Sequence, residues 1–265
     1  MNRTLLILAA SLASVILLLA ALKIFRGYST TGFVDQAPEH GVAFTIEADW
    51  SNGDAGTNGL LQLKTAVGRR ASRLGAAIYW EPISESRIRV VTTRTNLPGG
   101  GSVENALFRR GLLEFRLVHP AGDQFVELAQ IPSGYQILKL RRTGVGNLRP
   151  LESLVVKQES EPGLNGPLIK DAIVVRDQTG RPQINFRLTP AAVVAFARVT
   201  RENVGRRLAI ILDGELYSAP VIMTAIETGN CQITGEFEPP EAMELAAMLE
   251  SPLLFLVKVI EVKTF

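Results

Sequence analysis

The distribution of apolar residues along the chain predicts a mixture of short strands and amphipathic helices. Residues 42–49, VAFTIEAD, alternate between apolar and polar positions as a half-buried strand does. Residues 59–75 repeat apolar side chains at helical spacing and end at Gly75, which suits a helix terminus. This helix carries a small basic cluster that we expect to face solvent rather than to bind phosphate: Arg69, Arg70 and Arg73.

The following elements complete most of an α+β unit. Residues 86–94 and 112–120 alternate as strands, and residues 103–110 between them form a short helix with Ser102 as its N-cap. The order strand–helix–strand–helix–strand is most of a ferredoxin-like unit. The missing helix and strand are predicted only at the end of the chain, in residues 237–265.

A long insertion separates these two parts and is large enough to be a domain itself. Its first part, residues 121–147, indicates short strands and turns. Strands are then predicted at 170–177 and 183–189, followed by a helix with Thr189 as N-cap and Pro190 at its first position. We therefore expect a ferredoxin-like base domain, residues 42–120 and 240–265, split by an inserted α+β head domain, residues 121–239.

Residues 208–222, LAIILDGELYSAPVI, place two carboxylates on either side of a glycine. Asp213 and Glu215 could form an acid/base pair, or Asp213-Gly214 could be the corner of a hairpin. The hairpin is favoured, because Asp-Gly between apolar strands is typical of a type I′ turn and acid–base catalysis also needs a pocket. If the turn is purely structural, Asp213→Asn should be nearly silent.

The N-terminal region contains an apolar segment that we expect to span a membrane. Residues 5–22 carry no charge, and as a helix of about 18 residues they would reach roughly 27 Å, close to the ~30 Å of a hydrocarbon core. Lys23 and Arg26 follow directly, which favours an uncleaved signal anchor over a cleaved secretory peptide. We therefore expect a transmembrane anchor in residues 1–27 and a linker in residues 28–41, with the remainder on one side of the membrane.

Composition and motifs favour binding over catalysis. The net charge of +2 gives no indication of a nucleic-acid partner, and Cys231, the only cysteine, cannot form an internal disulfide. His40 and His119, even with Cys231, are an unpersuasive metal set. The glycine-rich segments lack the Lys-Ser/Thr of a phosphate-binding loop. We expect no catalytic site, no metal and no cofactor, and therefore no enzyme.

Residues 166–251 carry a run of segments that resembles a known family. The segments are, in order, GRPQINFRL, FARVTRENVGRRLAIILDGELYSAPVI, ITGEF and EAMELAAML. Together they resemble the first periplasmic domain of SecD, the larger half of the SecDF protein-export factor. The resemblance implies a base domain split by an inserted head, and it implies that these two parts shift relative to each other while they handle emerging preproteins.

Two departures from the family pattern bear on function. The Gly-Leu-Asp-Leu-x-Gly-Gly signature of SecD proteins corresponds here to QAPEHGVAF, in which Gly41 alone is kept. The family also continues into a bundle of membrane helices with buried charged residues, and these do not follow in this sequence. Since such residues would carry proton movement, we expect no proton coupling within residues 1–265.

The resemblance and the absence of a catalytic cluster predict a protein that binds translocating or unfolded polypeptide and assists Sec-dependent export. Binding would use backbone pairing and apolar grooves. The candidate groove residues, for which a core role is the alternative, are Tyr217, Val221, Ile222 and Phe237. We expect a single-pass protein of the inner (cytoplasmic) membrane with its soluble domain in the periplasm and with Sec translocon components as candidate partners. The alternative is a structural envelope adaptor that binds one fixed protein partner.

Overall fold

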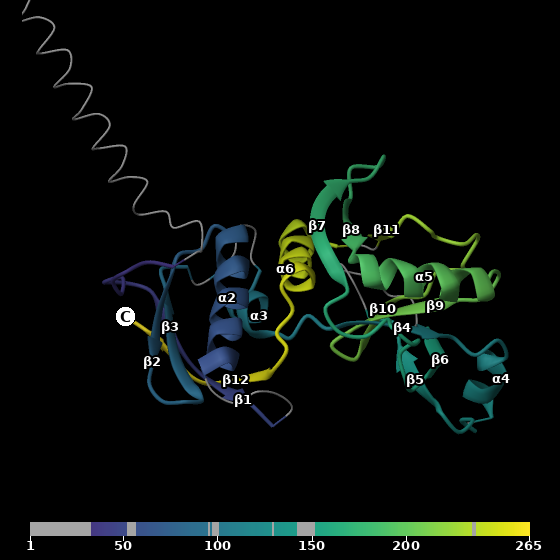
Figure 1. The fold of residues 1–265 in the computed structure, drawn as a ribbon, viewed down its shortest axis with the longest axis horizontal. Coiled ribbons are helices and arrows are strands. Elements are labelled where there is room, and N and C mark those ends of the chain that lie inside the picture. Colours follow the sequence, from purple (N-terminus) through teal and green to yellow (C-terminus); the bar gives the residue numbers. More distant parts are fainter. Residues whose placement is uncertain are drawn as a thin grey trace, which may run out of the picture.

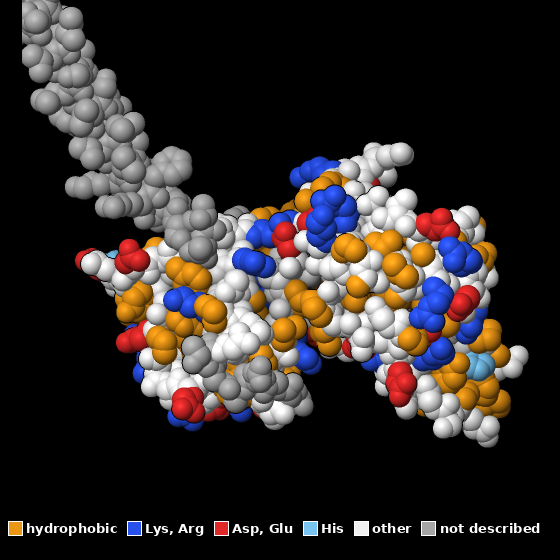
Figure 2. Space-filling view, in the orientation of Figure 1, with side chains coloured by type: hydrophobic (Ala, Val, Ile, Leu, Met, Phe, Trp, Pro, Cys, Tyr) orange, Lys and Arg blue, Asp and Glu red, His pale blue; other side chains and the backbone are white. Residues whose placement is uncertain are grey.

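The computed structural model describes residues 33–51, 57–94, 96, 101–128, 130–141, 152–234 and 237–265, which form two lobes (Figure 1). The predicted membrane anchor, residues 1–27, lies outside the described residues. No helix within the described ranges is long and apolar enough to cross a membrane. On the face shown in Figure 2, acidic, basic and apolar side chains are interspersed over both lobes, in line with the net charge of +2.

The first lobe, which we call the first unit, is an antiparallel sheet with helices packed on one face. Its strand order is β12-β1-β3-β2. Apolar side chains of α2 and α3 share one core with the central strands. The elements are β1 (Val42–Asp49), α2 (Thr57–Arg73), β2 (Ile78–Pro82), β3 (Arg87–Thr92), α3 (Val103–Phe108) and β12 (Leu256–Thr264).

The second lobe, the second unit, contains three small sheets, of which two share the main core and the β5-β6 sheet packs in a smaller second core. Their strand orders are β10-β9-β4, β11-β8-β7 and β5-β6, and helix α5 packs against the first two. The elements are β4 (Leu113–Leu117), α4 (Gly122–Glu127), β5 (Tyr135–Lys139), β6 (Ser153–Lys157), β7 (Ile169–Arg176), β8 (Pro182–Leu188), α5 (Pro190–Glu202), β9 (Leu208–Leu212), β10 (Glu215–Ser218) and β11 (Asn230–Ile233).

Helix α6 (Pro239–Glu250) lies between the two lobes and belongs to both cores (Figure 1). Leu245 and Met248 pack into the core of the second unit, whereas Ala247 packs into that of the first. A helix that is apolar on more than one side is buried on more than one side. The elements of the first unit follow in the order β1-α2-β2-β3-α3-α6-β12, which is the β-α-β-β-α-β order of a ferredoxin-like unit with α3 as an additional helix.

Two predictions about the strands are wrong. The strand at residues 113–117 does not join the sheet of the first unit, because β4 pairs with β9, Phe115 opposite Ile210. Its place in the first sheet is taken by β2, which the sequence analysis did not identify. The expected boundary after residue 120 therefore falls inside the second unit, and α4 occupies part of the segment in which only strands and turns were expected.

Arg70 is the third correction. Arg69 and Arg73 are exposed as expected, but Arg70 is 0% exposed and lies on the face of α2 that packs against the core. Burial lowers its pKa to about 9, which still leaves the guanidinium charged near neutral pH. Helical spacing contained the signal, since Arg70 continues the apolar series of Leu63 and Val67 at intervals of four and three residues.

Candidate functional site

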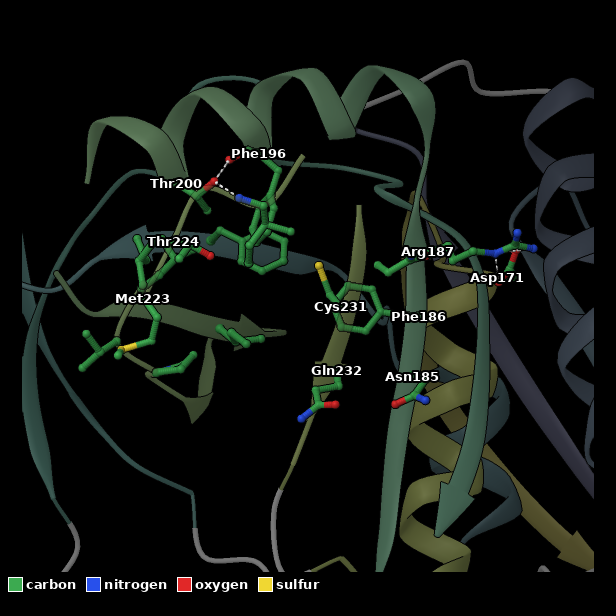
Figure 3. A pocket seen from close by; sticks show the side chains of 18 of the residues that line it. Asp171, Asn185, Phe186, Arg187, Phe196, Thr200, Met223, Thr224, Cys231 and Gln232 are labelled. Carbon is green, nitrogen blue, oxygen red and sulfur yellow. Dashed lines mark hydrogen bonds and ion pairs between the residues drawn. The ribbon is translucent and has the colours of Figure 1, made fainter. Parts of the chain in front are cut away.

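A cavity of about 620 Å³ opens in the second unit between α5, strands β8 and β11, and residues 220–226 (Figure 3). Phe186 and Phe196 contribute aromatic surface to it, and Asn185 and Gln232 lie together at one end. The other lining residues are Phe115, Asp171, Ile173, Arg187, Thr200, Leu208, Ile210, Pro220, Val221, Ile222, Met223, Thr224, Ile226, Asn230 and Cys231.

Residues 220–226, the loop that forms one wall of this cavity, are held by hydrogen bonds at two points, Ile222 and Ile226. Ile222 donates its N–H to Arg206 O at 2.8 Å and accepts from Gly205 N at 2.8 Å. Farther along, the N–H of Ile226 donates to the hydroxyl of Thr200 at 2.9 Å. Since Thr200 is fully buried in α5, the loop is attached to the helix and the cavity keeps its wall.

The interior of the cavity is nearly uncharged. Among the described residues that line it, Asp171 and Arg187 alone carry charge, and they pair in a bidentate arrangement at 2.6–3.0 Å. The hydrogen bond from Arg187 lowers the pKa of the Asp171 carboxyl. Burial raises the pKa of the Cys231 thiol to about 12, so this side chain is neutral at physiological pH. Such a surface suits apolar side chains and peptide groups better than an ion.

The edge of strand β11 borders the same cavity. Leu188 donates its N–H to Gly229 O at 2.9 Å, and an antiparallel ladder alternates with a period of two residues. The backbone groups of Cys231 and Ile233 therefore face β8, while those of Asn230 and Gln232 face outward. No described strand pairs with this outer edge. An extended chain could add to it and place alternate side chains in the cavity.

Two of the four predicted groove residues line this cavity and two do not. Val221, 48% exposed, and Ile222, 5% exposed, are part of the wall formed by residues 220–226. Tyr217 is a buried residue whose ring lies 4.8 Å from the Arg141 guanidinium, which also donates to its hydroxyl. Phe237 belongs to the core of the second unit. Neither of these aromatic residues contacts the cavity.

Sequence reasoning missed other residues at the mouth of the cavity. Met223 is 78% exposed and Ile173 is 52% exposed, both large apolar side chains. Ile173 carried a signal, because in β7 it alternates with the inward-facing Ala172 and Val174 and so must lie on the outer face. An apolar residue at an outward position is a candidate contact. Met223 lies in a loop, where no periodicity indicates its direction.

Asp213 and Gly214 form the corner between β9 and β10, with positive φ angles of 50° and 81°. Asp213 has a second role that the sequence did not predict. Its Oδ2 accepts the N–H of Gly111 at 3.0 Å and its Oδ1 accepts the N–H of Leu112 at 2.9 Å. The Glu215 carboxylate instead lies 3.3 Å from both Arg109 and Arg141. The two carboxylates share Arg109 as an ion-pair partner but otherwise bind different groups, and Asp213 also borders a separate hollow between α3 and β12.

Comparison with known proteins places this geometry in a family. The family model described as SecDF, P1 head subdomain, matches residues 142–255. The SecDF protein translocase subunit of Thermus thermophilus is 36% identical over 220 residues, which cover 80% of this chain and 28% of that protein. The SecD subunit of Leptotrichia buccalis is 38% identical over 143 residues, which cover 52% of this chain and 34% of that protein.

Solved structures extend the match to the fold. One structure, of a membrane component SecDF that enhances protein export, is 30% identical with a TM-score of 0.58, and the match covers 84% of this chain and all (100%) of that one. The chain belongs to the SecD/SecDF family. A crystal structure of SecDF in the super-membrane-facing form covers 97% of this chain and 35% of that chain, with 29% identity and a TM-score of 0.60.

The family relationship covers one part of the larger relatives. This chain spans about a third of the length of the curated relatives described above, 28% of the SecDF protein and 34% of the SecD protein. The match to the P1 head family model begins at residue 142 and reaches past α6. All residues that line the cavity except Phe115 therefore lie within the matched segment. The resemblance inferred from residues 166–251 is confirmed by this match.

Proposed function

We propose that this chain is a SecD-like extracytoplasmic domain that binds translocating or unfolded polypeptide and assists Sec-dependent export. In this proposal the N-terminal apolar segment anchors it in the inner membrane and Sec translocon components are its neighbours. It acts as a binding module without catalysis or proton coupling of its own. The family relationship supports the export role, since its relatives are protein translocase subunits.

The observation that carries the proposal is the open edge of β11 beside the apolar cavity. Unfolded chains differ in sequence but share a backbone, so a general binder gains from pairing with peptide groups. The outward backbone groups of Gln232 and the carbonyl of Asn230 offer such pairing, whereas the Asn230 N–H donates to the Thr228 hydroxyl at 3.5 Å. Phe186, Phe196 and Ile222 offer a surface for one or two apolar side chains. A Kd in the micromolar to millimolar range, about 4–8 kcal/mol, would allow release of the client.

The test uses the only cysteine of the chain as a reporter. Because Cys231 lines the cavity, a cysteine-free unfolded secretory protein should, when bound, slow the alkylation of Cys231 by iodoacetamide, and the same protein folded should not. Binding affinities for the two forms are measured in parallel, without ATP or added metal. Comparable affinity for both forms, or none for either, removes the polypeptide-binding proposal; selective affinity for one folded protein would leave the envelope adaptor.

Two pairs of variants separate the contribution of the β11 edge to polypeptide binding from that of the cavity. Gln232→Pro removes an outward N–H and leaves the ladder to β8 intact, so it should weaken binding, whereas Gln232→Thr should not. Val221→Glu places a charge at the mouth of the cavity and should weaken binding as well. Val204→Glu is its matched control, because Val204 is 54% exposed and does not line the cavity. Equal effects of Val221→Glu and Val204→Glu would exclude this cavity as the site.

A further inference from the structure

The chain leaves the first unit for the second through residues 109–112, between α3 and β4. It returns through residues 251–255, between α6 and β12, and the two connections meet where Leu253 donates its N–H to Arg110 O at 2.7 Å. Gly111 has a φ of +72°, and a Cβ atom there would lie 2.6 Å from Met248 O. We call the point where residues 109–112 meet residues 251–255 the crossing. It is closely packed against α6, and the backbone conformation of Gly111 there is one that glycine adopts readily.

Arg70 of the first unit binds both connections through their carbonyl groups. Its Nε donates to Ser251 O at 2.8 Å and its Nη2 donates to Arg110 O at 2.8 Å. Its Nη1 donates to Leu107 O at 3.1 Å and to Arg109 O. These carbonyls lie at and after the C-terminal ends of α3 and α6, where the helix dipoles favour a cation. One buried guanidinium thus joins two chain segments far apart in sequence.

Asp213 of the second unit binds the same outgoing connection through its amide groups. The carboxylate accepts the N–H groups of Gly111 and Leu112, and the Asp213 N–H donates to Leu112 O at 3.0 Å. Arg109 Nε lies 3.6 Å from Asp213 Oδ2 and adds an ion pair. Residues 109–112 therefore have their first two carbonyls bound from one unit and their last two N–H groups bound from the other.

We propose that Arg70 and Asp213 form a latch on residues 109–112 that holds the second unit in the orientation seen here, so that a shift of one unit relative to the other requires these hydrogen bonds to open. A flexible connection would let the units rotate about the crossing, because each residue has two soft backbone dihedral angles, φ and ψ. Hydrogen bonds from both sides restrict those angles. The guanidinium presents its donors in a rigid planar fork, which is what allows it to bind the two connections at once. The latch is a property of these residues and does not depend on the proposed binding of polypeptide.

The latch is tested by measuring the distance between the two units in the full chain. Spin labels are placed at the exposed positions Glu85 and Glu202, in a Cys231→Ala background, and the distance distribution is recorded by pulsed dipolar spectroscopy. The parent should give one narrow distribution. Asp213→Ala should broaden or shift it, while circular dichroism shows that the helices and strands are retained.

A matched control removes comparable hydrogen bonds inside one unit. The Asp177 carboxylate accepts the N–H groups of Thr179 and Arg181 in the turn between β7 and β8, at 2.8 and 2.9 Å. Asp177→Ala should leave the distribution unchanged. Arg70→Lys, which keeps a charge but cannot span both connections, should broaden it if the variant folds. An unchanged distribution in Asp213→Ala, or equal broadening in Asp177→Ala, overturns the proposal and leaves α6 packing as the sole determinant of orientation.

Discussion

The hydroxyl of Thr200 connects helix α5 to the wall of the cavity. It donates to Phe196 O at 2.8 Å within the helix and accepts the N–H of Ile226 at 2.9 Å from the loop. Phe196 and Ile226 both line the cavity. The buried Thr200 side chain therefore connects the wall formed by α5 to the wall formed by the loop. The hydroxyl thus holds the Ile226 end of the loop of residues 220–226, while backbone hydrogen bonds of Ile222 hold the other end.

Replacement of this hydroxyl should loosen the wall. Thr200→Val keeps the shape of the side chain but leaves the Ile226 N–H without its acceptor, so we expect the free energy of unfolding to fall by about 1–3 kcal/mol. Hydrogen exchange at residues 222–226 should accelerate. Thr200→Ser should restore both properties because it keeps the hydroxyl.

Thr65→Val is the matched control for this prediction. The Thr65 hydroxyl also donates to a helix carbonyl, Leu61 O, but the side chain is exposed and holds no second segment. Its replacement should change stability by no more than about 0.5 kcal/mol. A similar loss for both variants would mean that the bond to Ile226 contributes nothing particular.

Asp213→Asn should be destabilising, contrary to what the turn alone predicts. Asparagine suits the positive φ of the corner, but its amide can accept only one of the two N–H groups that the carboxylate oxygens accept separately. We expect a loss of about 1–3 kcal/mol in chemical denaturation.

The comparison that isolates this effect is Asp177→Asn. Both N–H groups bound by Asp177 donate to the same oxygen, Oδ1, which asparagine retains. Asp177→Asn should therefore cost little. If Asp213→Asn is equally mild, the second oxygen does not contribute to stability.

The sequence predicted the local structure well because hydrophobic period and capping are local properties. Residues 42–49 form β1 as expected, and the Ser102 hydroxyl accepts the N–H of Asn105 at 3.2 Å as the N-cap of α3. The positive φ angles at Asp213 and Gly214 follow from the Asp-Gly signal in the same way.

Long-range pairing was the part that could not be predicted. Leu113, Phe115 and Leu117 alternate as a strand, but period two does not say which sheet receives the strand. The cavity depends on the same kind of information, since β8, β11, α5 and residues 220–226 meet only in three dimensions. Of the nominated groove residues, Val221 and Ile222 line the cavity, whereas Tyr217 of the same segment lies in the core.

Glycine substitutions should distinguish a free turn from a packed crossing. Gly111 and Gly214 both have positive φ, 72° and 81°, but a Cβ on Gly214 would meet nothing within 4 Å. Gly214→Ala should therefore cost about 1–2 kcal/mol from backbone strain alone. Gly111→Ala should cost clearly more, because its Cβ would also collide with the backbone of Met248. Thermal unfolding of the two variants measures the difference, and equal costs would show that α6 yields at the crossing.

The Cys231 thiol should make stability fall at alkaline pH. Its pKa in the folded chain is raised by burial from about 9 to about 12, so between these values the unfolded state loses the proton and the folded state keeps it. Because the folded state binds more protons in this window, stability decreases as pH rises, by at most about 1.4 kcal/mol per pH unit. Below about pH 9 the thiol contributes no pH dependence.

Two measurements check this prediction. The difference in unfolding free energy between the parent and Cys231→Ala should be constant below the usual thiol pKa and should shrink above it, which cancels the contribution of lysine titration common to both. Alkylation of Cys231 by iodoacetamide should keep accelerating up to about pH 10 without a plateau, whereas the urea-unfolded chain should level off near the pKa of a free thiol, about 8.5. A plateau near that value in the folded chain would mean that the thiol is solvated, and the cavity wall at β11 would then be open to water.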